Sequence, residues 1–201
     1  MSHQHYHTEG FILKQTPIGE KDLLLSIFTR DFGLVRAKLK AGRSLASKMR
    51  FHASLFAWVE VSLIKTRGDA WKIVGLDSKA SLFNFKQKPH QYQIVDNVIS
   101  MLSRMVVGEN PQEEIFTDLV DFFSVIKNGV EVEKEVELKL LASLEVVIVF
   151  RILYYLGYIS PTTEMHNLLH TKIDTNLISI VAEQKRQVVG VINQAFYASG
   201  L

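Results

Sequence analysis

The front of the chain consists of short runs in which hydrophobic and polar residues alternate. The run 34–40 is the clearest, because Arg36, Lys38 and Lys40 would share one face of a strand and Val35 would point to the other. Turn-forming groups such as 66–69 separate the runs. We expect five strands, over residues 10–15, 22–29, 34–40, 55–65 and 70–76. Strands at this short spacing favour a small closed barrel of the OB-fold type.

The hydrophobic period changes to that of a helix after Pro89. Ile94, Val95, Val98 and Ile99 recur at helical spacing. We expect helices over residues 90–107, 111–127, 133–155, 163–170 and 174–198. The predicted fold is α+β in two parts. A five-stranded OB-fold β-barrel at residues 1–80 would bind nucleic acid, and an all-α helical domain at residues 88–201 would follow it.

Charge is divided unequally between these two parts. Residues 1–87 hold 14 Lys and Arg against 7 Asp and Glu, whereas residues 88–201 hold 9 against 14. The net charge of the whole chain, +2, hides this difference. The basic front suits an acidic partner such as nucleic acid, and the acidic helical part is the better candidate for protein contacts.

Several functional classes find no support in the sequence. The most apolar segment, 136–158, contains charged residues, and its longest strongly apolar stretch is only 146–150, so it predicts a buried helix and not a membrane span. Residues 1–7 are polar, unlike a signal peptide. The chain has no cysteine, which excludes disulfides and thiolate metal sites and suits a reducing cytoplasm.

The sequence also gives no sign of a catalytic site. The acidic run 131–137 fits a helix start better than a catalytic pair. No common catalytic motif is present, so we expect neither an enzyme nor a cofactor.

The candidate DNA-binding site is a cluster of cations in and after the third expected strand. No acidic residue occurs between Phe32 and Val59. Clustered cations bind phosphate backbones because the counterions that they release supply affinity. The candidate residues are Arg36, Lys38, Lys40, Arg43, Lys48 and Arg50. Lys14 and Lys21 are weaker candidates. The alternative is a solvated basic surface with no nucleic-acid ligand.

Four aromatic residues accompany these cations in the basic part of the chain. They are Phe51, Phe56, Trp58 and Trp71. Such rings stack on bases in OB-fold proteins that bind single strands. For each ring taken alone, packing in the barrel core is the better interpretation.

Two groups of histidines have a spacing that a metal site could use. His3, His5 and His7 alternate at the N-terminus, where a disordered end is the better explanation. His166 and His170 are four residues apart, but no motif or cysteine supplies further ligands. The sequence therefore predicts no metal site.

The first 50 residues resemble the opening of the bacterial recombination mediator family RecO. The run 8–14 is similar to the family's "T-x-G-hydrophobic-V-L" strand, 19–22 to its "G-E-x-D" and 28–33 to its "L-F-T-x-x-x-G". The basic segment 37–48 looks like the family's "A-K-G-A-R…S". Residues 150–158 are similar to its helix end "F-x-L-x-L-L-x-x-x-G-Y/F". The resemblance spans nearly the whole chain and is looser after Pro89.

The chain departs from the family pattern in two places. Many members carry a four-cysteine zinc site after the Gly-Tyr helix end, but the matching segment 160–166 has no cysteine, so the zinc module is absent. The order Lys40-Ala41-Gly42-Arg43 stands where the family usually has Lys-Gly-Ala-Arg, which bears on the geometry of that loop.

The resemblance implies a mediator that binds single- and double-stranded DNA and anneals complementary strands. It also implies RecR and the C-terminal tail of the single-stranded DNA-binding protein SSB as partners, and a role in loading the recombinase RecA. A tail that ends in a carboxylate needs an apolar pocket beside a cation, for which Arg104, Lys139 and Arg151 are candidates. The alternative is an OB-fold interaction module that binds RNA or a protein and DNA only incidentally. A third interpretation is an enzyme with an unfamiliar site.

Overall fold

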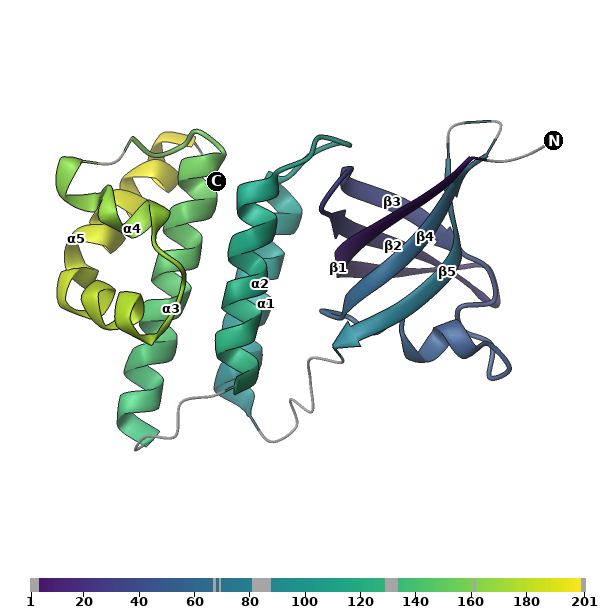
Figure 1. Cartoon of the computed structure of the whole chain (residues 1–201), viewed down its shortest axis with the longest axis horizontal. Coiled ribbons are helices and arrows are strands. Elements are labelled where there is room, and N and C mark those ends of the chain that lie inside the picture. The colour runs from purple at the N-terminus through teal and green to yellow at the C-terminus, as the bar shows by residue number, and fades with distance from the viewer. Residues whose placement is uncertain are drawn as a thin grey trace. The chain divides into compact units, whose positions relative to one another are not determined.

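The computed structural model of the chain describes residues 4–66, 68, 70–80, 88–128, 134–160 and 162–199. Two compact units are present: residues 1–84 with 99–113, and residues 85–98 with 114–201. Figure 1 labels the strands of the first unit and the helices. The expected division into domains at residues 1–80 and 88–201 stays a prediction.

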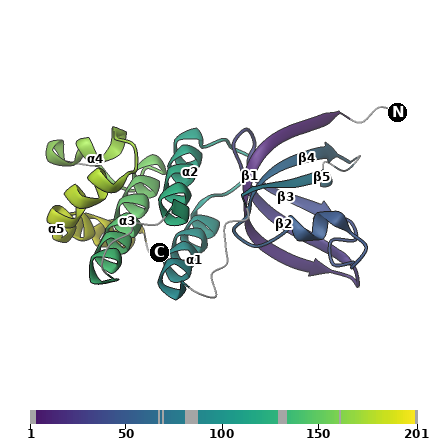
Figure 2. The ribbon, with the colours of Figure 1, turned by 60° about the horizontal axis from the view of Figure 1, so that its bottom comes forward.

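Five strands form a closed barrel, as predicted. They are β1 (His5–Ile18), β2 (Asp22–Thr29), β3 (Gly33–Leu39), β4 (Trp58–Lys65) and β5 (Trp71–Ala80). The order round the barrel is β1-β2-β3-β5-β4. Every pairing is antiparallel except that of β3 with β5, which is parallel. Figure 2 gives a second view of the strands as they curve round the barrel. The arrangement is that of the OB-fold.

Strand β1 is longer than expected because it serves two neighbours. Its first half, from His5, pairs with β4, and its second half, from Gly10, pairs with β2. His5 and His7 therefore lie in a strand, and the expectation of a disordered end is wrong for both. The ring Nδ1 of His7 lies 2.9 Å from the Ser62 hydroxyl oxygen on β4. His3 lies outside the described residues.

Alternate residues of each strand fill the barrel core. On β3 the core side chains are Val35, Ala37 and Leu39, all fully buried. Such alternation is what a strand with one face on a core requires. The indole of Trp71 is part of the same core and meets the ring of Tyr6 edge to face, with ring centroids 5.2 Å apart. The hydrophobic pattern of the sequence thus fixes which face of each strand points outward.

The connection from β3 to β4 contains the short 3-10 helix η1 (Lys48–Phe51). Met49 packs against the barrel core. The backbone N–H of Ser78, on β5, donates to Nδ1 of His52 over 3.1 Å. Phe56 has φ = 64°, which no extended strand allows, so β4 begins at Trp58 and not at residue 55 as expected.

Residues 106–112 pack on the end of the barrel within the first unit. The backbone N–H of Leu34 donates to the Gly108 carbonyl over 3.1 Å. The indole N–H of Trp71 donates to Glu109 Oε1 over 2.7 Å. Gly33 has φ = 66°, and a Cβ there would lie 2.3 Å from the Asn110 carbonyl oxygen. Glycine at residue 33 is therefore required both for the turn and for this close approach.

The back of the chain is helical, as predicted. The helices are α1 (Pro89–Met105), α2 (Glu113–Asn128), α3 (Lys134–Tyr155), α4 (Asn167–His170) and α5 (Thr175–Ser199). The expected helix over 163–170 is instead the 3-10 helix η3 (Thr163–Met165) followed by the single turn of α4. No helix within the described residues is long and apolar enough to cross a membrane.

Helix α3 is the central element of the helical part and ends in a glycine cap. Gly157 has φ = 80°, and the N–H of Tyr158 donates to the Leu153 carbonyl over 2.8 Å. This is the Schellman arrangement, in which a glycine just past the helix satisfies the last carbonyls. Buried side chains lie all round the second half of α3, which confirms a core helix.

A buried ion pair joins α3 to α2. The guanidinium of Arg151 lies 2.7 Å from the Asp118 carboxylate, and both residues are almost fully buried. The same guanidinium donates to the carbonyls of Leu168, over 2.7 Å, and Thr171. Arg151 thus fixes the segment around α4 to the helix core. It is not exposed to a partner tail, so the hypothesis that it binds one is wrong.

Candidate nucleic-acid interface

Strand β3 presents its cations outward, as the alternation predicted. Arg36 and Lys38 are exposed, and the residues between them are buried in the core. Lys40 follows directly after β3 and is also exposed. Alternate residues of a strand lie about 7 Å apart, so these three cations form a row of about 14 Å.

The cross-strand register adds two more cations to this row. Arg36 pairs with Ser26 on β2, and Ser26 pairs with Lys14 on β1. On the other side of β3, Lys38 pairs with Lys72 on β5. We call the resulting outer surface the cationic face. It consists of Lys14, Arg36, Lys38, Lys40 and Lys72, and it extends across four strands.

One carboxylate lies among these cations. Asp22 Oδ2 is 2.8 Å from the ammonium of Lys38, and Asp22 Oδ1 accepts the backbone N–H of Ala41 over 2.8 Å. The hydrogen bond from Lys38, with that from Ala41, lowers the pKa of Asp22. The other four members of the cationic face form no ion pair with any described residue. An excess of positive charge therefore remains on this surface.

The other three candidates lie in the connection from β3 to β4. Arg43 is tied to the turn between β1 and β2, because its N–H donates to the Lys21 carbonyl over 2.8 Å and its guanidinium to the Gly19 carbonyl over 3.3 Å. This brings Lys21, a weaker candidate, beside Arg43. Lys48 and Arg50 lie on η1.

The four aromatic candidates divide into three environments. Phe56 and Trp71 are 2% and 4% exposed, so they belong to the core. Trp58 is half-buried, with its ring stacked on that of Phe11 at 5.9 Å between centroids. Phe51 is 69% exposed. Core packing is thus confirmed for two of the four rings, and Phe51 has solvent around it.

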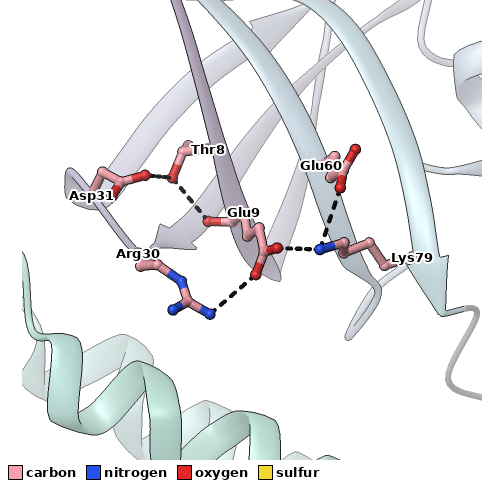
Figure 3. Close-up of polar contacts among 6 residues, drawn as sticks. All are labelled: Thr8, Glu9, Arg30, Asp31, Glu60 and Lys79. Atoms are coloured by element: carbon pink, nitrogen blue, oxygen red, sulfur yellow. Dashed lines mark hydrogen bonds and ion pairs between the residues drawn. The ribbon is translucent and has the colours of Figure 1, made fainter.

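The outer surface of the seam between β1 and β4 has the opposite character. Glu9, Glu60 and Asp77 lie side by side on β1, β4 and β5. Figure 3 shows Glu9 between Arg30 and Lys79, with Lys79 also reaching Glu60. Burial alone would raise the pKa of Glu9, but the contacts with these two cations outweigh it and lower the pKa.

This acidic surface encloses an open pocket of about 540 Å³. The Asp31 carboxylate beside it accepts the Thr8 hydroxyl over 2.5 Å (Figure 3). Carboxylates outnumber cations round the pocket, so it would repel phosphates. Glu9 lies in the half of β1 that pairs with β4, whereas Lys14 lies in the half that pairs with β2. The candidate interface is therefore confined to the cationic face and the connection that follows β3.

Sequence reasoning missed Lys72 because its partner is distant in the chain. The parallel ladder between β3 and β5 places it beside Lys38. Its position one residue after Trp71, a core side chain, was the available signal, since alternation sends it outward. Lys14, a weaker candidate from the sequence, becomes a member of the face through the register of β1 with β2.

The histidine and acidic candidates in the helical part assemble no metal site. No group of three or more metal-ligating side chains is found in the described part of the chain. His166 and His170 are both exposed. In the acidic run, residues 131 and 133 lie outside the described residues, and Glu137 lies within 3.4 Å of the Gln91 side-chain amide.

The candidate cations for a partner tail differ in exposure. Arg104 and Lys139 are exposed, unlike Arg151.

Comparison with known proteins identifies the barrel. Residues 1–73 match the family model described as Recombination protein O N terminal. The N-terminal barrel is therefore similar to the N-terminal part of RecO proteins. A DNA repair protein RecO from Thermodesulfovibrio yellowstonii is 27% identical over 114 residues, which cover 56% of this chain and 45% of the relative. One from Dehalococcoides mccartyi is 29% identical over 142 residues, 69% of this chain and 55% of the relative.

The RecO match contains every residue of the candidate interface. Residues 1–73 include the cationic face, Arg43 and the whole of η1. The aligned part spans about half the length of these RecO relatives. The similarity to RecO therefore covers the barrel, and the recognition of the RecO opening in the sequence is confirmed.

Proposed function

We propose that this chain acts in DNA repair and recombination, and that it does so by binding DNA on the cationic face of its barrel. The observation that carries the proposal is the register. It gathers cations from three strands, β1, β3 and β5, onto one surface around a single carboxylate, Asp22. The matched relatives are named DNA repair proteins, which supports the same role for this chain.

Such a surface holds the sugar-phosphate backbone and reads no sequence. Phosphate contacts position a nucleic acid, and base contacts specify it. The row from Arg36 to Lys40 is exposed, which suits a backbone that runs along β3. We propose that it accepts single- and double-stranded DNA, because both present the same phosphates.

Annealing of complementary strands follows from the same electrostatics. A cationic surface screens the repulsion between two backbones and raises their local concentration. This activity needs no catalytic residue, so we propose a mediator and not an enzyme. The proposed mediator would help to load RecA onto DNA coated by SSB.

The proposed protein partners are RecR and the C-terminal tail of SSB. The family resemblance supports both. For the SSB tail, Arg104 and Lys139 remain candidate cations, because both are exposed. We place this activity in the cytoplasm, where chromosomal DNA and these partners would be met.

Fluorescence anisotropy with labelled single-stranded DNA across a salt series tests the DNA-binding proposal. The test variant carries Arg36→Glu, Lys38→Glu and Lys40→Glu. The control carries Lys127→Glu, Lys172→Glu and Arg186→Glu, which change the charge equally at exposed residues of the helical part. If the face makes three to six phosphate contacts, log affinity should fall with log salt at a slope of about −2 to −4.

The two variants should then behave differently. We expect the cationic-face variant to lose most of its affinity and to show a flatter slope, and the control to bind within a few-fold of the wild type. Failure of the wild type to bind at low salt, or equal losses in both variants, would overturn the proposal. RNA of the same sequence is measured in parallel, because clearly tighter RNA binding would favour an RNA-binding module that recognises the 2′-hydroxyl.

A further inference from the structure

Phe51 is an aromatic side chain displayed to solvent by a basic segment. It is 69% exposed, at the end of η1. Its ring is accessible to a ligand in the same connection that carries Arg43, Lys48 and Arg50 of the candidate interface. Within the described residues 4–80, no other aromatic side chain of Phe, Tyr or Trp is as exposed. Phe51 is therefore the most exposed aromatic ring of the described barrel.

The backbone that carries Phe51 is fixed. Met49, two residues before it, packs into the barrel core. His52, one residue after it, is held to β5 through Ser78, whose hydroxyl oxygen is 2.9 Å from His52 Nδ1. Ala53, which follows, is buried, and its carbonyl accepts the side-chain amide of Gln15 on β1. A ring presented from a fixed turn loses little conformational freedom on binding.

A cation lies directly against the ring. The guanidinium carbon of Arg50 is 5.4 Å from the centroid of the Phe51 ring. This distance is in the range of a cation–π contact. No acidic residue neighbours this pair in the sequence, since none occurs between Phe32 and Val59. Lys48, on the same turn, adds a second positive charge.

A ring and a cation side by side match the two parts of one nucleotide. Aromatic side chains stack on unpaired bases without regard to sequence, and an adjacent cation contacts the phosphate. A base inside a duplex is already stacked on its neighbours and cannot present its flat surface to a side chain. A stacking contact with Phe51 is therefore open to a single strand and not to a duplex.

The cationic face lacks such a ring. The outward neighbours of its lysines and arginine on β2 are Ser26 and Leu24. Trp71, next to Lys72, is turned into the core. This face contacts phosphates only and has no means of preferring unpaired bases.

We propose that Phe51 and Arg50 form a subsite for one unpaired base and its phosphate, which gives the barrel a preference for single-stranded over double-stranded DNA. The inference rests on the proposed DNA binding and adds that two parts of the barrel have different roles in it. The cationic face binds the backbone of either form, and η1 recognises that a strand is unpaired.

The experiment compares Phe51→Ala with Phe51→Tyr and Leu45→Ala. Leu45 is 84% exposed in the same connection, so its replacement removes apolar surface without removing a ring. Affinities are measured for a single strand, for a duplex of equal length and for a single strand of equal length whose sites are abasic. All three substitutions are at exposed side chains, and thermal unfolding checks that each variant is folded.

The stacking hypothesis makes a specific set of predictions. Phe51→Ala should weaken binding of the single strand by roughly 5- to 100-fold, since each stacked base contributes that much in single-strand binding proteins. Its affinities for the duplex and for the abasic strand should stay within about twofold of the wild type. Phe51→Tyr should bind the single strand nearly as well as the wild type, and Leu45→Ala should lose far less than Phe51→Ala.

The outcomes separate this inference from the DNA-binding proposal. A wild type that binds no DNA would overturn both. A wild type that binds, with a Phe51→Ala variant that loses affinity equally for single strand and duplex or for neither, would overturn the subsite and leave the cationic face intact. An equal loss on the abasic strand would also overturn it, because no base is present there to stack.

Discussion

Lys38 and Lys72 are paired in the parallel ladder between β3 and β5, so two positively charged residues lie side by side on the outer surface of the barrel. Like charges on neighbouring strands are destabilising. Asp22 offsets the charge of Lys38, but no described residue forms an ion pair with Lys72. The arrangement is unfavourable for folding alone and favourable for holding an anion. The lysine beside β1 and β4 differs from Lys72, because Lys79 forms ion pairs with the neighbouring carboxylates of Glu9 and Glu60.

The first prediction concerns Lys72, which the sequence did not indicate. Lys72→Gln removes one positive charge from the cationic face and leaves the strand intact. We expect weaker DNA binding, and a salt slope that is smaller in magnitude by about 0.7 for single strands, the value for one lost phosphate contact. Salt-dependent anisotropy measures it. Lys127→Gln on α2 is the control, and an unchanged slope for Lys72→Gln would remove Lys72 from the interface.

The second prediction concerns Asp22, the carboxylate within the cationic face. Its lowered pKa means that it carries a negative charge at neutral pH, where it competes with phosphate for Lys38. Asp22→Asn removes the charge but keeps an oxygen that can accept the Ala41 N–H. We expect tighter DNA binding and a slope steeper by about 0.7 for single strands, because Lys38 becomes free for a phosphate. Weaker binding would instead show that Asp22 orients Lys38.

The sequence predicted the barrel well because the alternation of hydrophobic and polar residues within each strand can be recognised without knowing the strand's neighbours. Alternation of hydrophobic residues along β3 determines which side chains enter the core, and the outward direction of Arg36 and Lys38 follows from it. The failures come from contacts between distant segments. The pairing of Lys38 with Lys72 depends on a parallel ladder, and the first half of β1 becomes a strand because β4 pairs with it.

Burial of charged residues was also beyond local reasoning. From the sequence, Arg151 was one of three candidate cations for a partner tail, together with Arg104 and Lys139. Arg151 lies on the core helix α3, where a carboxylate from α2 and two carbonyls around α4 receive its guanidinium. Conversely, the sequence could not tell that Phe51 is exposed while Phe56 is buried. Both follow from the path of one connection, which turns at Phe56 through a positive φ.

The third prediction compares two glycines that both have positive φ. Gly33 has φ = 66° and faces the backbone of Asn110, whereas Gly108 has φ = 79° and open space, with no atom within 4 Å of the point that a Cβ would occupy. Gly108→Ala should cost about 1 to 2 kcal/mol, the penalty of the left-handed conformation. Gly33→Ala should cost clearly more, because the new Cβ also collides with the backbone of residue 110. Denaturant unfolding measures both, and equal losses would show that residues 106–112 can move off the barrel.

The last prediction is a pH dependence from the buried pair of Asp118 and Arg151. Burial raises the pKa of Asp118 to about 6, although the Arg151 charge opposes the shift. Its Oδ2 is buried and has no hydrogen-bond partner among the described residues, which is consistent with an energetic penalty for ionising this carboxyl. The folded state therefore holds a proton on Asp118 at pH values where the unfolded chain, with a pKa of 3.8, has released it.

The sign of the effect follows from this difference. Because the pKa is higher in the folded state, the contribution to stability is fully present below about pH 3.8 and is lost as the pH rises through about 6. A shift of this size corresponds to about 3 kcal/mol between the two ends of that range. Asp118→Asn cannot titrate but keeps an oxygen to accept from Arg151. The free energy of unfolding of the wild type minus that of Asp118→Asn should fall between pH 4 and 7 in denaturant titrations. A difference that rises over this range would mean that the attraction of Arg151 outweighs burial and that Asp118 is ionised throughout.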